Sequence, residues 1–128
     1  MNETLKEHGL RLTPQRIELL KVLEKIGRHH PSFSEVYETV KRKYANVSQS
    51  TILNNLTAMV DIGLIQRFSY NGETRYELNP EPHVNFVDSS GVILDIENAD
   101  ITRLITKLLE LINSSTGVKT KRILILAE

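Results

Sequence analysis

Residues 47–78, VSQSTILNNLTAMVDIGLIQRFSYNGETRYEL, decide the fold of this chain. The first half has the apolar spacing of a helix with one polar face, and Gly63 is placed to end it. The second half predicts two short strands joined at Asn71-Gly72, the strongest short signal for a hairpin. A helix followed directly by a hairpin is the outline of a winged helix-turn-helix, in which the helix enters a DNA groove. We therefore expect residues 1–79 to form a winged-helix DNA-binding domain.

The composition of the 128 residues is that of an ordinary globular protein, with 40% hydrophobic and 25% charged residues. No apolar run reaches the roughly 18 residues of a membrane span, and the N-terminal stretch lacks the apolar region of a signal peptide. A cytoplasmic protein without membrane contact is therefore expected. The absence of cysteine excludes disulfides and thiolate metal sites. Net charge is zero, but Lys and Arg slightly exceed Asp and Glu in residues 1–79, which is the sign expected of a part that meets phosphates.

Two further helices are predicted before the deciding stretch. Thr13-Pro14 suits the cap and the first position of one helix, and Gly27 is placed to end it. Ser32 with Glu35 fits the capping box of the next helix. A short helical segment is also predicted over residues 2–8. Together with the deciding stretch, these helices complete the expected N-terminal domain.

The predicted helix after Val47 has two unlike faces. Apolar residues at helical spacing, from Ile52 to Val60, are expected to face a core. The opposite face is short-chained and carries no charged side chain; it comprises Gln49, Ser50, Leu53, Asn54 and Thr57. Hydroxyl and amide groups read base edges, and a leucine can touch a thymine methyl. A merely solvated face is the alternative, but such faces usually carry Lys and Glu, so we expect contact with DNA bases.

Two arginines lie on the predicted hairpin, in which a two-residue turn places Arg67 opposite Tyr76. Arg67 and Arg75 are placed to reach DNA phosphates or a minor groove. They are equally placed to pair with Glu77 or Glu73 of the same hairpin. The sequence alone leaves these two roles open.

A second unit is predicted after the hairpin. The tetrapeptide at residues 79–82 holds two prolines, which cannot continue a central strand, so residues 80–82 are expected to form a hinge. Residues 83–128 predict a strand, a second strand, a helix and a last strand. Asp100 is a candidate cap for that helix, and residues 114–117 are expected to break it.

The fold class that follows is α+β: an N-terminal winged helix-turn-helix domain and a small α/β dimerisation domain of order β-β-α-β. The last strand, residues 122–127, is apolar on both faces. A unit of about 46 residues cannot bury so much apolar surface alone. Homodimerisation is the simplest solution, and two-fold symmetry suits a palindromic site on double-stranded DNA.

Several segments in a fixed order carry a family resemblance: Gly9-Leu-Arg-Leu-Thr-Pro-Gln-Arg16, His30-Pro31 with Ser34-Glu-Val-Tyr37, residues 47–56, Gly63-Leu-Ile65 and Arg75-Tyr-Glu-Leu78. With these segments the sequence resembles the ferric uptake regulator (Fur) family, which includes peroxide-, zinc-, nickel- and manganese-responsive repressors. The resemblance covers nearly the whole chain. It implies a protein that binds operator DNA as a dimer when a divalent metal occupies a site between its two domains.

The resemblance also implies roles in DNA binding for individual residues. The recognition-helix positions of the family correspond here to Ser50, Thr51, Leu53 and Asn54. Leu53 stands where many members carry a tyrosine, so an aromatic contact would become an aliphatic one. Arg16 would contact a phosphate near the recognition helix.

The regulatory metal site implied by the resemblance corresponds to His30, Glu77, His83, Asn85 and Asp95. Asn85 departs from the family pattern, because a neutral amide is a poorer transition-metal donor than the usual imidazole. The remaining two histidines and two carboxylates suit one divalent metal per subunit, Zn²⁺, Fe²⁺ or Mn²⁺.

The other metal sites of the family are expected to be absent. The cysteine pairs of its structural zinc site have no counterpart in this chain, and Ser89-Ser90-Gly91 occupies the region of the first pair. The His/Asp-rich run of a further site is reduced to Pro82-His83-Val84. The dimerisation domain would then depend on its apolar core rather than on a metal.

Three functional classes compete on this evidence. The first is a metal-regulated transcription regulator, expected to act as a repressor. The second is a metal-independent winged-helix regulator or a protein-interaction module, which the outward Leu53 and the zero net charge allow. The third is a metal-dependent hydrolase, but the chain has neither a nucleophile motif nor a Gly-rich phosphate loop. We therefore expect a regulator and not an enzyme.

Overall fold

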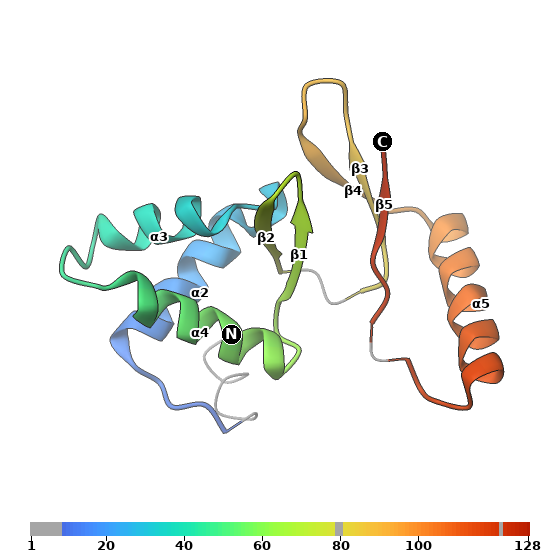
Figure 1. The fold of residues 1–128 in the computed structure, drawn as a ribbon, viewed down its shortest axis with the longest axis horizontal. Coiled ribbons are helices and arrows are strands. Elements are labelled where there is room, and N and C mark those ends of the chain that lie inside the picture. The colour runs from blue at the N-terminus through green and yellow to red at the C-terminus, as the bar shows by residue number, and fades with distance from the viewer. Residues whose placement is uncertain (1–8, 79–80, 121) are drawn as a thin grey trace. The chain divides into compact units, whose positions relative to one another are not determined.

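A computed structural model describes residues 9–78, 81–120 and 122–128 of the chain (Figure 1). The chain divides into two compact units, Met1–Pro80 and Glu81–Glu128. The helix predicted over residues 2–8 lies outside the described residues, as does the first residue of the predicted hinge. No described helix is both long enough and apolar enough to cross a membrane.

From residue 9 onward, the first unit contains three α-helices that pack together: α2 (Pro14–Ile26), α3 (Phe33–Lys41) and α4 (Gln49–Asp61). The predicted caps are confirmed for the first two. The side chain of Thr13 accepts a hydrogen bond from the Arg16 amide, and Ser32 and Glu35 form the reciprocal capping box. Ser48 caps α4 by accepting from the Thr51 amide. Each such cap contributes about 1 kcal/mol to helix stability.

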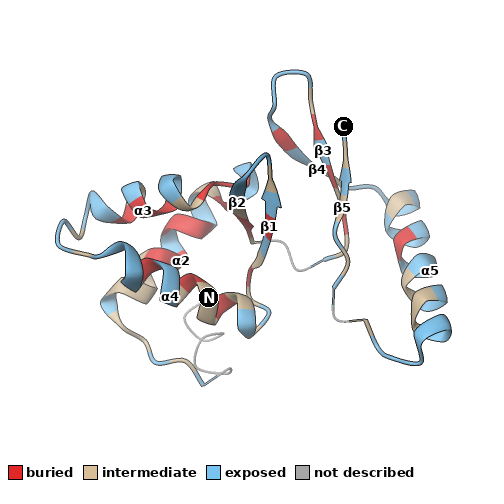
Figure 2. Ribbon diagram, viewed as in Figure 1, coloured by how far each residue is buried: buried red, intermediate tan, exposed pale blue. Residues whose placement is uncertain are grey.

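The core of the first unit lies between these helices and the hairpin that follows them. Figure 2 shows its buried residues on the inward faces of all three helices. The core consists of Leu19, Leu20, Val22, Leu23, Val36, Tyr37, Val40, Ile52, Leu56, Met59, Ile65 and Tyr76. The apolar face predicted for α4 is therefore confirmed, and burying it leaves the polar face outward.

The hairpin consists of β1 (Gln66–Tyr70) and β2 (Glu73–Glu77), which pair antiparallel. Asn71 and Gly72 have φ values of 51° and 77°, the left-handed pair that a tight hairpin turn requires. The predicted register is confirmed, because Arg67 lies opposite Tyr76. Gly63, with φ 79°, ends α4 in the left-handed conformation expected of it.

The second unit consists of β3 (Val84–Val87), β4 (Ile93–Ile96), α5 (Ala99–Thr116) and β5 (Ile125–Ala127). Its sheet has the order β4-β3-β5, in which β4 runs antiparallel and β5 parallel to β3. The predicted β-β-α-β order is confirmed, and the α+β class with it. The last strand is shorter than predicted.

Both predicted ends of α5 are wrong by a few residues. The helix is capped by Asn98, which accepts from the Ile101 amide, whereas Asp100 lies in its first turn. At the other end the helix continues to Thr116, and Gly117 with φ 71° terminates it. Serine and threonine can remain helical when they lie in the last turn, but the left-handed residue favours glycine.

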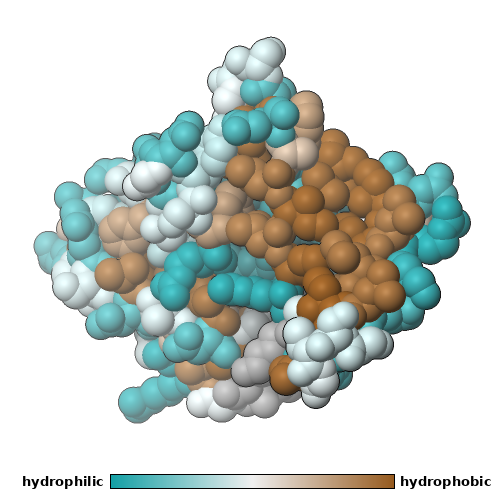
Figure 3. Space-filling view, turned by 45° about the vertical axis from the view of Figure 1, so that its right-hand side comes forward, coloured by the Kyte–Doolittle hydropathy of each residue, from teal (hydrophilic) through white to brown (hydrophobic). Residues whose placement is uncertain are grey.

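The second unit leaves much of its apolar surface exposed (Figure 3). Its large hydrophobic residues that are exposed by more than a third are Phe86, Val92, Leu94, Leu104, Leu108, Leu111, Val118, Leu124 and Leu126. Monomeric proteins rarely expose many large apolar side chains in one contiguous patch, and such a patch usually marks an interface.

Candidate functional site

The outer face of α4 is accessible in the structure. Five of the predicted base-reading residues are exposed: Gln49, Ser50, Thr51, Leu53 and Asn54. Thr57, one turn further along, is half-buried. The Thr51 hydroxyl lies 2.9 Å from the Ser48 hydroxyl, so this side chain also takes part in the helix cap. The face presents hydroxyl and amide groups and one leucine, a set suited to base edges.

Arg16 is fixed beside α4 by two hydrogen bonds. Its Nε donates to Asn55 Oδ1 at 2.9 Å, and its Nη1 donates to the Arg11 carbonyl at 2.9 Å. These bonds hold a cation at the edge of the helix, where a phosphate contact is predicted. Sequence reasoning missed Asn55, because nothing in the local pattern indicates a partner 39 residues away.

The two arginines of the β1–β2 hairpin, Arg67 and Arg75, differ in their surroundings. Arg67 is exposed, and its Nη1 lies 3.5 Å from Thr57 Oγ1 on α4. Burial raises the pKa of the Tyr76 phenol, and Arg67 opposes this shift through its charge and a hydrogen bond. Arg67 thus connects the β1–β2 hairpin to the outer face of α4 through its contact with Thr57.

Arg75, in contrast, takes the internal role that the sequence left open. It pairs with Glu73 at 3.0 Å, and its Nη1 donates to the His30 carbonyl at 3.2 Å. Its side chain is only 23% exposed. The pairing with Glu73 that was predicted as the alternative role is therefore present in the structure, and the contact with DNA stays a prediction.

One predicted pair of metal ligands lies within the first unit. His30 Nε2 is 2.9 Å from Glu77 Oε2, and the two side chains are 0% and 1% exposed. Glu77 comes from the end of β2, and His30 follows a short 3₁₀ turn, η1 (Gly27–His29). Gly27 has an ordinary helical φ of −59°, whereas His30 adopts the left-handed φ of 52°. Left-handed conformations at residues other than glycine are uncommon and gather at functional sites.

The other predicted ligands lie together within the second unit. His83 directly precedes β3, Asn85 lies within it, and the register places Asp95 of β4 opposite Asn85. His83 Nδ1 donates to the Glu81 carbonyl at 2.7 Å, since a carbonyl can only accept. The other ring nitrogen, Nε2, lies 3.2 Å from Asn85 Oδ1 and 3.4 Å from Asp95 Oδ1.

The donor chemistry of both groups fits a divalent transition metal. Each group holds one imidazole and one carboxylate, and the ligand candidates include no cysteine. In the second unit, an imidazole nitrogen lies within 3.4 Å of two side-chain oxygens, and these are donor types that a divalent metal accepts. A backbone carbonyl that fixes the other ring nitrogen, as Glu81 does, is typical of metal-binding histidines.

The chain belongs to the ferric uptake regulator family, because the model of that family matches residues 7–125. It is 48% identical over 86 residues to a ferric uptake regulation protein homolog from Archaeoglobus fulgidus, covering 67% of each chain. It is 31% identical over 104 residues to the peroxide-responsive repressor PerR of Staphylococcus aureus, covering 79% of this chain and 69% of the other.

A solved structure of a zinc-bound manganese uptake regulator is also similar, with a TM-score of 0.68 and 27% sequence identity. That similarity covers 98% of this chain and 96% of the other. The predicted family and fold are therefore confirmed.

Proposed function

We propose that this chain is a transcriptional repressor that binds a palindromic operator as a homodimer, with an affinity controlled by a divalent metal. Family membership supports the class of function. The observation that carries DNA binding is the outer face of α4, where exposed amides and hydroxyls lie on a helix that carries no charged side chain from Gln49 to Val60. The exposed apolar side chains of the second unit support a dimer. A cytoplasmic location follows from this function.

We further propose that His30, Glu77, His83 and Asp95 together bind one Zn²⁺, Fe²⁺ or Mn²⁺ per subunit. The two histidine–carboxylate pairs support this assignment, since each has donor atoms that such ions prefer. A bound divalent cation would neutralise the carboxylates and tie one unit to the other. Because the pairs belong to different units, joint ligation favours one arrangement of the units, and DNA affinity rises if that arrangement fits the operator.

Operator binding can be tested by gel shift at two salt concentrations, with and without added Mn²⁺. Affinity should fall steeply with salt, because phosphate contacts release counterions. Asn54→Ala should weaken binding to the operator by about 1–3 kcal/mol, the worth of a good base contact. Ser34→Ala, on the exposed side of α3, is the matched control and should bind as the wild type. Salt-independent binding, or none, would argue against a DNA-binding protein.

Asn85 gives a second test, directed at the metal. Replacing it with histidine supplies the imidazole that Zn²⁺ prefers over an amide oxygen. We expect Asn85→His to raise Zn²⁺ affinity by about tenfold. Changes to the groups around a metal ligand typically alter metal affinity by about 10- to 100-fold, and this value is the lower end of that range. Competition with a coloured chelator measures this, and Mn²⁺ affinity, measured in parallel, should change less. Equal Zn²⁺ affinity in the two proteins would place Asn85 outside the site.

A protein-interaction module is the second candidate, and one observation favours it. Leu53 is 44% exposed at the centre of the α4 outer face, where a protein partner would bury it. Leu53→Ala discriminates the two candidates, because in a DNA complex a single thymine contact is a small part of the affinity. If Leu53→Ala weakens binding only to DNA sites that carry a thymine at the base that Leu53 contacts, the result supports the repressor.

A further inference from the structure

The loop that carries His30 lies against β2 through its backbone. The Tyr76 amide donates to the Pro31 carbonyl at 3.0 Å, and Ser32 and Arg75 form an isolated antiparallel bridge. These contacts fix the loop directly after His30, at Pro31 and Ser32. They do not by themselves account for the left-handed φ of 52° at His30. Such a conformation is unfavourable at a residue other than glycine, and it persists only where surrounding contacts hold it.

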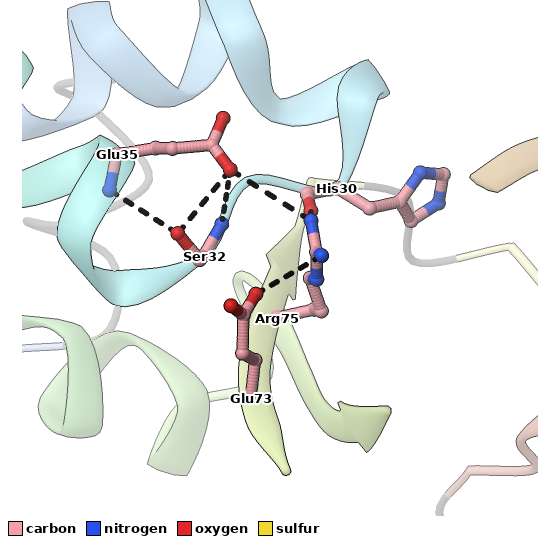
Figure 4. A network of polar contacts seen from close by, with 5 residues as sticks. All are labelled: His30, Ser32, Glu35, Glu73 and Arg75. Carbon is pink, nitrogen blue, oxygen red and sulfur yellow. Dashed lines mark hydrogen bonds and ion pairs between the residues drawn. The ribbon is translucent and has the colours of Figure 1, made fainter. Parts of the chain in front are cut away.

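The Arg75 side chain supplies a contact of this kind. Its Nη1 donates to the carbonyl oxygen of His30 itself at 3.2 Å. The same guanidinium is held by Glu73 at 3.0 Å and lies 3.7 Å from Glu35. In Figure 4 the guanidinium lies between these two carboxylates, and the imidazole ring of His30 points away from the network. A hydrogen bond from a charged donor is among the stronger ones.

Glu35 connects this network to helix α3. Its Oε1 accepts hydrogen bonds from the amide and the hydroxyl of Ser32, which close the capping box of that helix. The position of the guanidinium is thus set by a helix cap on one side and by β2 on the other. A rigid guanidinium anchored in this way can hold the His30 carbonyl in one orientation.

From these contacts we infer that Arg75 is a positioning residue for the metal site: it holds the His30 backbone so that the ring meets Glu77. This inference rests on the proposed function, because it assigns Arg75 to the site formed by His30 and Glu77. Orienting groups around metal ligands typically change metal affinity by 10- to 100-fold when removed. Arg75 acts through the main chain rather than through the ring, so we expect the lower end of that range.

The test compares two arginines of the same hairpin. Arg75→Met and Arg67→Met remove the same charge and keep an apolar stem. Mn²⁺ affinity of the full chain is measured by chelator competition, DNA affinity by gel shift at saturating Mn²⁺, and thermal unfolding without metal. Arg75→Met should bind Mn²⁺ about tenfold more weakly and bind DNA within about twofold of the wild type once saturated. Arg67→Met should show the reverse, with weaker DNA binding and unchanged Mn²⁺ affinity.

A second variant keeps the inference testable if Arg75→Met fails to fold. Glu73→Gln removes one anchor of the guanidinium at an exposed position, and it should weaken Mn²⁺ binding in the same direction by a smaller factor. Wild-type Mn²⁺ affinity in Arg75→Met, or a lower unfolding temperature with unchanged affinity, would overturn the positioning role. Reduced DNA affinity of Arg75→Met at saturating Mn²⁺ would overturn it in favour of a phosphate contact. If the wild type itself binds no metal, the proposed function fails instead.

Discussion

Replacing His83 with alanine should abolish the metal dependence of operator binding. The substitution removes the Nε2 donor that faces Asp95 at 3.4 Å, and with it the nitrogen that the second unit offers to a metal. Coupling between a metal and DNA is typically worth about 1–3 kcal/mol, or 5- to 150-fold in affinity. The variant should bind operator at the metal-free level of the wild type at every Mn²⁺ concentration. A gel shift over a Mn²⁺ titration measures this.

His29→Ala is the matched control for that substitution. His29 is exposed and directly precedes the predicted ligand His30. It should keep the full response to Mn²⁺, while circular dichroism should show all three proteins folded. A His83→Ala protein that responds to metal as the wild type does would remove this histidine from the site. A wild type that binds operator equally with and without metal would point to a metal-independent regulator.

Introducing two negative charges on the exposed apolar side of α5 should convert the protein to a monomer and prevent operator binding. Leu104, Leu108 and Leu111 recur at helical spacing and are 67%, 42% and 54% exposed, whereas Ile105, about a quarter-turn away, is buried. Leu104→Glu with Leu108→Glu would bury two carboxylates in a dimer interface, which costs several kcal/mol for each. Loss of a dimer removes one of two half-site contacts, so operator affinity should fall by at least about 100-fold.

Light scattering on a sizing column measures the dimer, and a gel shift measures the operator affinity. Thr106→Glu is the control, because its exposed side chain lies on the opposite side of α5. It should remain a dimer. If the double variant also remains a dimer, the interface lies elsewhere on the second unit, and the exposed Leu94 of β4 and Leu126 of β5 become the next candidates.

The parts of the fold that the sequence predicts well are those set by near neighbours. Asn71-Gly72 requires only its own backbone preference to make the turn, and the Ser32–Glu35 box spans three residues. The ends of α5 were predicted less well, because Asn98 and Asp100 are both good caps two residues apart. In the structure Asn98 is the cap, because its side chain accepts from the Ile101 amide, and the local pattern does not distinguish the two.

The sequence supplied the candidate ligands as a list of residues but not their geometry. Family resemblance indicated His30, Glu77, His83 and Asp95, whereas composition alone made the histidines ordinary loop residues. The pairing of His83 with the Glu81 carbonyl, which fixes the ring, depends on how the chain turns before β3. Arg75 shows the same limit. Its charge suggested DNA, and only the fold brings it to a carbonyl 45 residues away.

The parallel pairing of β5 with β3 also sets an order of assembly during synthesis. The first unit contains the whole α4–hairpin stretch and can fold while later residues are still being added. The sheet of the second unit cannot be completed until Ile125–Ala127 has emerged, because β5 pairs with β3 some 40 residues earlier. Newly made chains should therefore acquire the DNA-reading part first and the ability to pair with a partner last.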